Sequence, residues 1–337
     1  MSELINIKSF VDVVVTGKKV MNKNALKGMG AAINEQFSSL SMAKILYPED
    51  SPKKLFNRYK FLLRSFLYRE KLERMYVLFN APLLKPLSEK YPELLDKPLR
   101  PYRFAKSNAH ERALMMEEHY HLLSAHFPEL IEPLYLKTGI TLGHFPVSSY
   151  QVVLRYDGTF RREGELTISI INERSERLYS CAFSLAGSQA QLALVIGSVQ
   201  GPEPSVENAS DVVRAMTKEL HGLRPKSLVV MLVMILANSI NAHQVLAVKK
   251  SAHVFQAKRY SKKQKSNLQS DYDELWSEFG AKELDANFVE LVQQNRKPLE
   301  EIASKKRAMY RRRYEWQDLV EQNINAIFPV RILHQKA

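Results

Sequence analysis

The sequence predicts an α+β protein, with a helical N-terminal region over residues 1–145 and a mixed, largely antiparallel sheet domain over residues 146–337. Two observations predict this class. The first region is rich in Leu, Met, Lys and Glu, with apolar residues at helical spacing in residues 55–80 and 109–127. After Pro146 the chain instead carries short segments rich in β-branched and aromatic residues. The change of pattern therefore marks the boundary between the two regions.

Each region can be divided further. Five prolines between residues 82 and 101 predict a turn-rich connection between the N-terminal helices. In the second region four strands are predicted, at residues 151–156, 165–171, 177–185 and 191–199. Because the connectors are short, neighbouring strands are expected to pair antiparallel, as a meander. Arg155 and Glu165 are expected on an exposed face of this sheet.

The pattern changes again after Val199, where helices alternate with strands and a mixed α+β core follows. The run between Lys226 and Lys249 contains no charged residue, but its continuous apolar part is too short to cross a bilayer. We therefore expect a buried helix followed by a buried strand. The predicted elements are helices at 208–220, 227–240, 271–280 and 299–327, and strands at 243–248 and 288–292.

Composition narrows the classes of function. The 337 residues carry a net charge of +13, which favours a polyanionic partner: an anionic membrane, a phosphate-bearing cofactor or nucleic acid. No nucleic-acid module, phosphate-binding loop or dinucleotide fingerprint is recognisable, so nucleic acid is the weakest of the three. The single Cys181 excludes an intramolecular disulfide framework. Together with the absence of a signal-like start, it predicts a cytoplasmic protein, with attachment to the inner membrane left open.

The leading candidate site is the turn TKELHGLRPK, residues 217–226, directly before ten apolar residues. Gly222, Arg224 and Lys226 crowd the point where a buried helix begins, and a helix N-terminus favours anions. The alternative is that Gly222 ends one helix and Pro225 opens the next, with the two cations merely solvated.

Two further basic stretches follow. Residues 249–265 carry His253, Arg259 and Tyr260 after a predicted strand, where His253 could act as an acid or base or be a half-buried structural histidine. No metal-ligand spacing is found, including among the histidines of residues 109–127, so no metal is predicted. Residues 296–314 predict an amphipathic docking helix, or a solvated helix with internal ion pairs. Its candidate docking residues are Lys305, Lys306, Arg311, Arg312 and Arg313.

Several segments together resemble the VirK/YbjX family of Gram-negative bacteria, with agreement in order and spacing over roughly residues 60–325. They are REGELTISI, RLYSCAFSL, IGSVQGP, TKELHGLRPK, Arg259-Tyr260, DYDELWSEFG and RKPLEEIASKKRAMYRRRY. The resemblance implies a cytoplasmic or inner-membrane-associated protein linked to virulence and to envelope resistance against antimicrobial peptides. It implies no settled biochemical activity and no catalytic residue.

Two hypotheses remain. The order of elements looks like the Gcn5-related N-acetyltransferase arrangement, in which a coenzyme A pyrophosphate rests on a helix N-terminus. His253 or Glu219 would then deprotonate an amine, and Tyr260 would protonate the leaving thiolate. The phosphates would be held by His221, Gly222, Arg224, Lys226 and Ser227. The alternative is a non-enzymatic envelope or virulence factor that docks on an anionic membrane or an envelope protein through its basic C-terminal helix.

Overall fold

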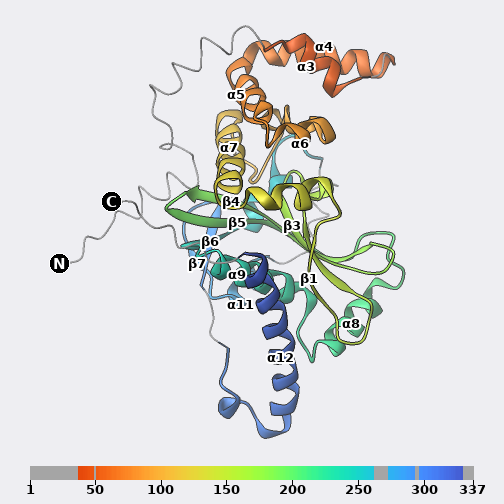
Figure 1. Cartoon of the computed structure of the whole chain (residues 1–337), viewed down its shortest axis with the longest axis vertical. Helices are drawn as coiled ribbons and strands as arrows, with labels where there is room; N and C mark the ends of the chain where they lie inside the picture. Colours follow the sequence, from red (N-terminus) through yellow and green to blue (C-terminus); the bar gives the residue numbers. More distant parts are fainter. Residues whose placement is uncertain (1–36, 49–50, 262–271, 293–295, 329–337) are drawn as a thin grey trace, which may run out of the picture.

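The molecule is elongated, with a helical group at one end, a sheet in the middle and a long helix at the other end (Figure 1). It is described by a computed structural model that covers residues 37–48, 51–261, 272–292 and 296–328. The structure is α+β, which confirms the predicted fold class at this level.

The N-terminal group is helical, as its composition predicts. The helical spacing of residues 55–80 corresponds to two helices, because the chain leaves the helical conformation at Tyr68 (φ −120°, ψ 24°). Asn108 starts the last helix with a capping box, in which its side chain accepts from the N–H of Glu111 and the Glu111 carboxylate accepts from Asn108. The helices are α3 (Ser39–Leu46), α4 (Pro52–Leu67), α5 (Arg69–Asn80), α6 (Lys85–Lys90) and α7 (Ala109–His126).

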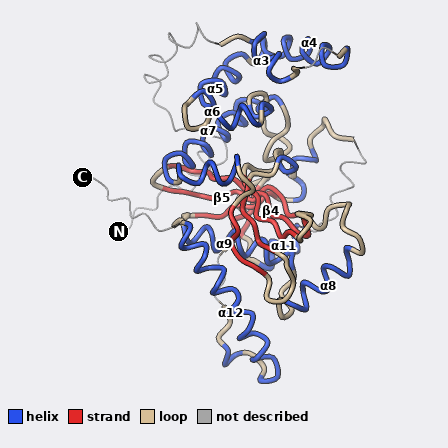
Figure 2. Tube along the Cα trace, turned by 45° about the vertical axis from the view of Figure 1, so that its right-hand side comes forward, coloured by secondary structure: helices blue, strands red, loops and turns tan. Residues whose placement is uncertain are grey.

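Eight strands form one sheet in the order β1-β2-β3-β4-β5-β6-β8-β7, visible as the central red layer in Figure 2. The four predicted strands of the meander are confirmed, and each pairs antiparallel with the next strand of the meander. The strands are β1 (Ile140–His144), β2 (Gln151–Arg155), β3 (Leu166–Ile171), β4 (Arg177–Ser188), β5 (Gln191–Gln200), β6 (Gln244–Val248), β7 (Lys282–Glu283) and β8 (Phe288–Leu291). Neither β1 nor β7 was predicted, and β1 lies before Pro146.

One pair of strands is parallel. β5 pairs with β6 from Ala193–Gln244 to Ile196–Ala247, and β5 then continues to Gln200 while β6 ends at Val248. The connection between them passes through two helices, α8 (Ala209–Glu219) and α9 (Pro225–Ser239). The last residues of β5 therefore extend beyond the partner strand, at the carboxyl ends of the parallel pair.

Helices cover both faces of the sheet. In Figure 1, α7 lies on one face of the sheet and α9 on the other, and α12 (Ser304–Ile327) packs on α9 and β1. A strand covered on both faces is buried along its whole length, and every residue of β3 is buried. For the same reason the expectation of an exposed Glu165 is wrong, since this side chain is buried beneath α7.

The uncharged run between Lys226 and Lys249 forms the buried helix α9 and the buried strand β6, as predicted. Within the described part of the chain, no helix combines the length and apolar character needed to cross a bilayer. The remaining described α-helix is α11 (Tyr272–Glu278), which follows β6 in the chain and supplies side chains to the sheet's carboxyl edge.

Candidate functional site

Buried and half-buried polar side chains gather where the parallel strands β5 and β6 end. We call this group the strand-end cluster: Glu163, Gln200, His253, Tyr260 and Tyr272. In open sheets with parallel strands, ligands bind in the crevice outside the carboxyl ends of those strands. The cluster therefore occupies the position in the fold where a ligand site is most expected.

Glu163 is the carboxylate of this cluster. Its backbone lies against β5, because a Cβ added at Gly197 would come within 1.9 Å of the Glu163 carbonyl oxygen. The side chain is 1% exposed, and the amide of Gln200 reaches one of its oxygens at 3.5 Å. The other oxygen, Oε2, has no hydrogen-bond partner among the described residues. Burial raises the pKa of Glu163 to about 7, although the Arg162 guanidinium acts in the opposite direction.

His253 follows β6 and is held by the segment that precedes α7. Phe104 forms an isolated β-bridge with His253, and the N–H of Ala105 donates to Ala252. The ring nitrogen Nδ1 accepts from the N–H of Phe255 at 3.3 Å, which places the proton of a neutral ring on Nε2. Burial lowers the pKa of His253 to about 4, so the ring is neutral at pH 7. Nε2 has no partner among the described residues. His253 is therefore buried, and it carries an unpaired donor rather than a free base.

Aromatic rings join the members of the cluster. The ring of Tyr272 stacks on that of His253 at 5.6 Å and 17°, and its hydroxyl exchanges hydrogen bonds with the backbone of Val199. Phe255 contacts both His253 and Tyr260, so the two predicted catalytic residues on this loop lie in one group. Burial raises the pKa of Tyr260, and the Arg162 guanidinium, 5.3 Å from its ring centre, opposes that shift.

The turn predicted to hold phosphates joins α8 to α9. His221 and Gly222 both have positive φ values, 53° and 80°. The N–H of Gly222 donates to the carbonyl of Thr217, and this hydrogen bond closes the C-terminal end of α8. A cleft of about 660 Å³ opens beside this turn. The cationic and imidazole side chains that line it are Arg214, Lys218, His221, Arg224 and Lys226.

The N-terminus of α9 already has an anionic partner from this chain. Arg224 forms an ion pair with Glu278 of α11, and the hydroxyl of Ser227 donates to the same carboxylate at 2.8 Å. A carboxylate at a helix N-terminus satisfies the preference for negative charge that the sequence indicates there. Two of the five predicted phosphate-binding residues are thus engaged by Glu278.

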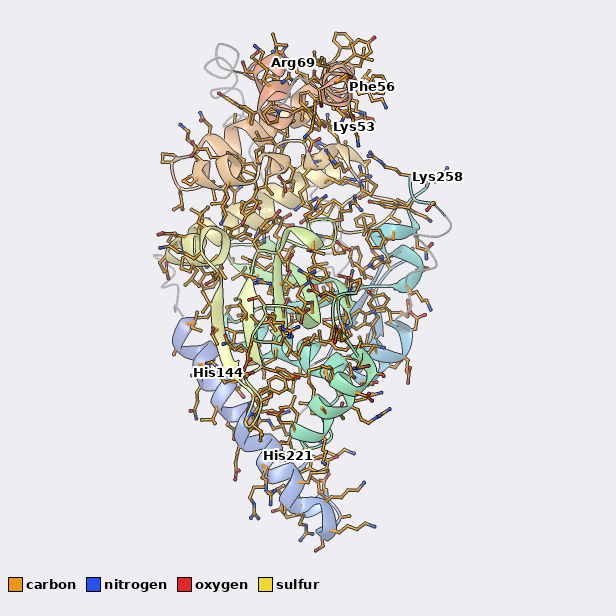
Figure 3. The ribbon with its side chains drawn as sticks, turned by 90° about the vertical axis from the view of Figure 1, so that its right-hand side faces the viewer. Lys53, Phe56, Arg69, His144, His221 and Lys258 are labelled. Atoms are coloured by element: carbon orange, nitrogen blue, oxygen red, sulfur yellow. The ribbon has the colours of Figure 1, made fainter. Side chains whose placement is uncertain are left out.

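Glu219, the third predicted catalytic residue, has a different partner set. Its Oε1 accepts from the backbone N–H groups of Val147 and Ser148, at 2.7 and 2.8 Å, and so holds the β1–β2 loop. In Figure 3, His221 lies toward the end of the molecule that carries α12. Lys258, which lies between His253 and Tyr260 in the chain, is toward the opposite end. Glu219, Arg224 and Ser227 are therefore engaged by the β1–β2 loop and by Glu278 rather than by His253 or Tyr260.

The predicted docking residues divide into two kinds. Four side chains on α12 are exposed: Lys305, Lys306, Arg311 and Arg312. Arg313 is half-buried, and its guanidinium donates to the carbonyl of His221 while lying 4.3 Å from the ring centre of Tyr310. Arg313 therefore attaches α12 to the end of α8, which is a structural contact within the chain.

A second buried polar group lies between α7 and the sheet and was not predicted. Lys97 pairs with Glu165 at 2.5 Å, and the Tyr120 hydroxyl donates to the same carboxylate at 2.9 Å. His119 contacts the Tyr135 hydroxyl and accepts from the N–H of Leu185. Burial lowers the pKa of Lys97, although the Glu165 carboxylate opposes this shift. Each charge is paired, so this group fastens α7 to β3 and β4.

Sequence reasoning missed Glu163 and Tyr272 for a physical reason. Charged residues near a strand end are usually solvated, whereas Glu163 and Glu165 are buried by elements distant in the chain. One signal was present: Glu163 and Glu165 flank Gly164, directly before the apolar run of β3. Two carboxylates around a glycine at the start of a strand are a pattern from which a candidate site can be predicted.

The fold and the cluster together define an α+β protein with one mixed sheet and a buried polar site at the ends of its parallel strands. The family model for a protein of unknown function, DUF535, matches residues 50–326, and the chain belongs to this family. It is 30% identical to the uncharacterized protein YbjX of Escherichia coli over 91% of this chain and 96% of that protein. These matches agree with the resemblance found in the sequence.

Two other relatives extend the comparison. An uncharacterized protein of Haemophilus influenzae is 29% identical over 82% of this chain and 91% of its own length. A protein of Mannheimia haemolytica named membrane protein LapB is 25% identical over 56% of this chain and 81% of its own. No solved structure matches the chain.

Proposed function

We propose that this protein transfers an acyl group from a thioester, with its reaction centre at the strand-end cluster. One observation carries the proposal: a carboxyl group with a pKa near 7 and a neutral imidazole donor, each with one unpaired buried atom, occupy the carboxyl ends of the parallel strands. Displaced pKa values and unpaired polar atoms in such a position are typical of reaction centres.

The strand order supports this class. A meander, then a parallel strand reached through helices, then an antiparallel pair is the order of the Gcn5-related arrangement considered from the sequence. In that arrangement the thioester donor is a coenzyme A derivative. Because a fold does not fix a function, the proposal rests on the side chains at the strand ends rather than on the strand order.

The chemistry assigns one role to each group. Glu163 accepts a proton from an attacking amine as the new N–C bond forms and the C–S bond of the thioester breaks. His253 Nε2–H donates to the developing carbonyl oxyanion. Tyr260 gives its proton to the leaving thiolate, and the proton on Glu163 returns to Tyr260 through solvent. A base with a pKa near 7 suits this exchange better than an ordinary carboxylate does.

The geometry changes where the donor is expected to bind. Because Arg224 and Ser227 are engaged by Glu278, we propose that the donor occupies the strand ends rather than the 221–227 turn. Calorimetry with acetyl-coenzyme A separates the two sites. The Arg224→Ala/Lys226→Ala variant is expected to bind as tightly as the wild type.

Turnover is measured as thiol release from acetyl-coenzyme A in the presence of primary amines. Glu163→Gln, which keeps the shape of the side chain, is expected to retain donor binding and to lower turnover by about 100-fold or more. The matched control is Glu300→Gln, an exposed carboxylate far along the chain, which is expected to leave both unchanged. A folded wild type that binds no coenzyme A thioester contradicts the proposal.

We place this activity at the cell envelope, in line with the resemblance to the VirK/YbjX family. The name of the Mannheimia haemolytica relative, membrane protein LapB, supports that placement without describing an activity.

The second hypothesis, docking of α12 on an anionic membrane or envelope protein, has its support in the four exposed cations of the predicted docking set. Within the described part of α12, only Leu319 adds an exposed large hydrophobic side chain, so the helix offers little apolar surface.

A further inference from the structure

Exposed apolar side chains are concentrated at the end of the molecule opposite α12. Among the described residues, twelve large hydrophobic side chains are exposed, and nine of them lie between Leu40 and Tyr68, on or next to α3 and α4. Phe66 is 87% exposed and Leu67 74%. Exposed apolar patches of this kind mark interaction surfaces.

The exposed residues of α4 form one continuous face. At 100° per residue, the apolar side chains fall within about 120° of the helix circumference. They are Leu55, Phe56, Tyr59, Leu63, Phe66 and Leu67. The opposite side of the helix holds its two buried residues, Phe61 and Ser65, which face the protein. The exposed apolar residues therefore form one continuous face of the helix and are not scattered over its surface.

Basic side chains border this face. Lys53, Lys60 and Arg64 are exposed and occupy the adjoining arc of the same helix. Neither α3 nor α4 contains an Asp or Glu residue. Figure 3 shows Lys53 and Phe56 together at this end of the molecule. An apolar face bordered by cations and free of acidic residues on its own helix is the pattern of a helix that lies in a membrane interface.

We propose that α4 docks on an anionic phospholipid surface, with its apolar face among the acyl chains and Lys53, Lys60 and Arg64 against lipid phosphates. Charge favours a lipid surface over two other occupants of this face, which are the N-terminal segment of the same chain and a second copy of the protein. The first 36 residues carry five lysines against three carboxylates, so they do not complement a basic surface. A second copy would oppose the same cations across a two-fold axis. An anionic bilayer complements both the apolar and the basic parts of the face.

The test is flotation of the full-length protein with vesicles of phosphatidylcholine alone or mixed with phosphatidylglycerol. We expect wild-type binding to the mixed vesicles and much weaker binding to phosphatidylcholine. Phe66→Ser/Leu67→Ser is expected to weaken binding at least about tenfold through lost apolar burial. Lys60→Glu/Arg64→Glu is expected to weaken binding to the anionic vesicles by a similar factor.

Matched controls come from α12. Leu319→Ser removes an exposed apolar side chain, and Lys305→Glu/Lys306→Glu reverses two exposed cations, both away from α4. These variants are expected to bind within about twofold of the wild type, and circular dichroism checks that each variant is folded.

Three results would overturn the proposal. They are absence of wild-type binding to phosphatidylglycerol vesicles, loss of binding in the α12 variants with retention in the α4 variants, and a solution dimer that the Phe66→Ser/Leu67→Ser change dissociates. The second would assign the membrane to α12, and the third would assign the α4 face to another copy of the chain.

Discussion

Glu163 and Lys97 are buried in two different ways. Lys97 has its counter-charge in Glu165, so both stay inside as an ion pair. Glu163 has no ion-pair partner among the described residues, and burial therefore raises its pKa to about 7. His253 is the complementary case, because burial without a carboxylate lowers its pKa to about 4. At neutral pH Glu163 can therefore exchange protons, whereas Lys97 and Glu165 are held together as a buried pair.

The raised pKa of Glu163 has a consequence for stability. In the unfolded chain this carboxyl titrates near 4.5, and in the folded protein near 7. As pH rises from about 4.5 to 7, the folded state binds more protons at this site than the unfolded state, so its contribution to the free energy of unfolding falls. We expect urea denaturation from pH 4.5 to 7.5 to show a smaller decline in Glu163→Gln than in the wild type.

The exposed Glu300→Gln variant is the control, since it should leave the pH dependence of unfolding unchanged. Equal pH slopes in the Glu163→Gln variant and the wild type would mean that Glu163 is ionised in the folded protein, contrary to the assignment above.

At the scale of elements, the sequence predicts what is encoded locally. The strands of the meander and helix α9 follow from β-branched runs and from a continuous apolar run, and both are confirmed. β1 was missed because ITLGH is short and contains a glycine, and it becomes a strand by pairing with β2. The surroundings of Glu165 depend on α7 and those of Glu163 on β5, and both elements lie far from them in the chain, so no local pattern predicts them.

β5 fixes the position of Glu163 through Gly197. A Cβ at Gly197 would meet the Glu163 carbonyl oxygen at 1.9 Å, and a backbone atom cannot move aside cheaply. We expect Gly197→Ala to lower the free energy of unfolding by about 1–3 kcal/mol or more, as overpacking does. Gly158→Ala is the matched control, because no atom lies within 4 Å of the added Cβ. Its change in stability is expected to stay within about 0.5 kcal/mol by chemical denaturation.

Equal effects of the two alanine substitutions would show that the chain relaxes around Gly197. In that case Glu163 would not be held in place by β5, and its position in the strand-end cluster would need another support.

At the scale of the whole molecule, composition predicts a division at residue 145, whereas the hydrophobic core is continuous across that position. One cluster of buried hydrophobic residues runs from Phe37 to Phe328. α7 packs on β4, and the Lys97–Glu165 pair joins the N-terminal region to β3. Composition changes along the chain, but it does not report which elements bury one another. The helical region and the sheet are therefore expected to depend on each other for stability.

This dependence can be measured because both tryptophans, Trp276 and Trp316, lie in the sheet region, each donating to a backbone carbonyl. Their fluorescence reports the sheet region, whereas far-ultraviolet circular dichroism also reports α3 to α7. We expect the two urea transitions to coincide.

Lys97→Met leaves Glu165 buried without its partner. This change should shift both curves together and lower the free energy of unfolding by about 3–5 kcal/mol. If the dichroism alone shifts, the helical region is a separately folding unit, and the boundary near residue 145 is a true domain boundary.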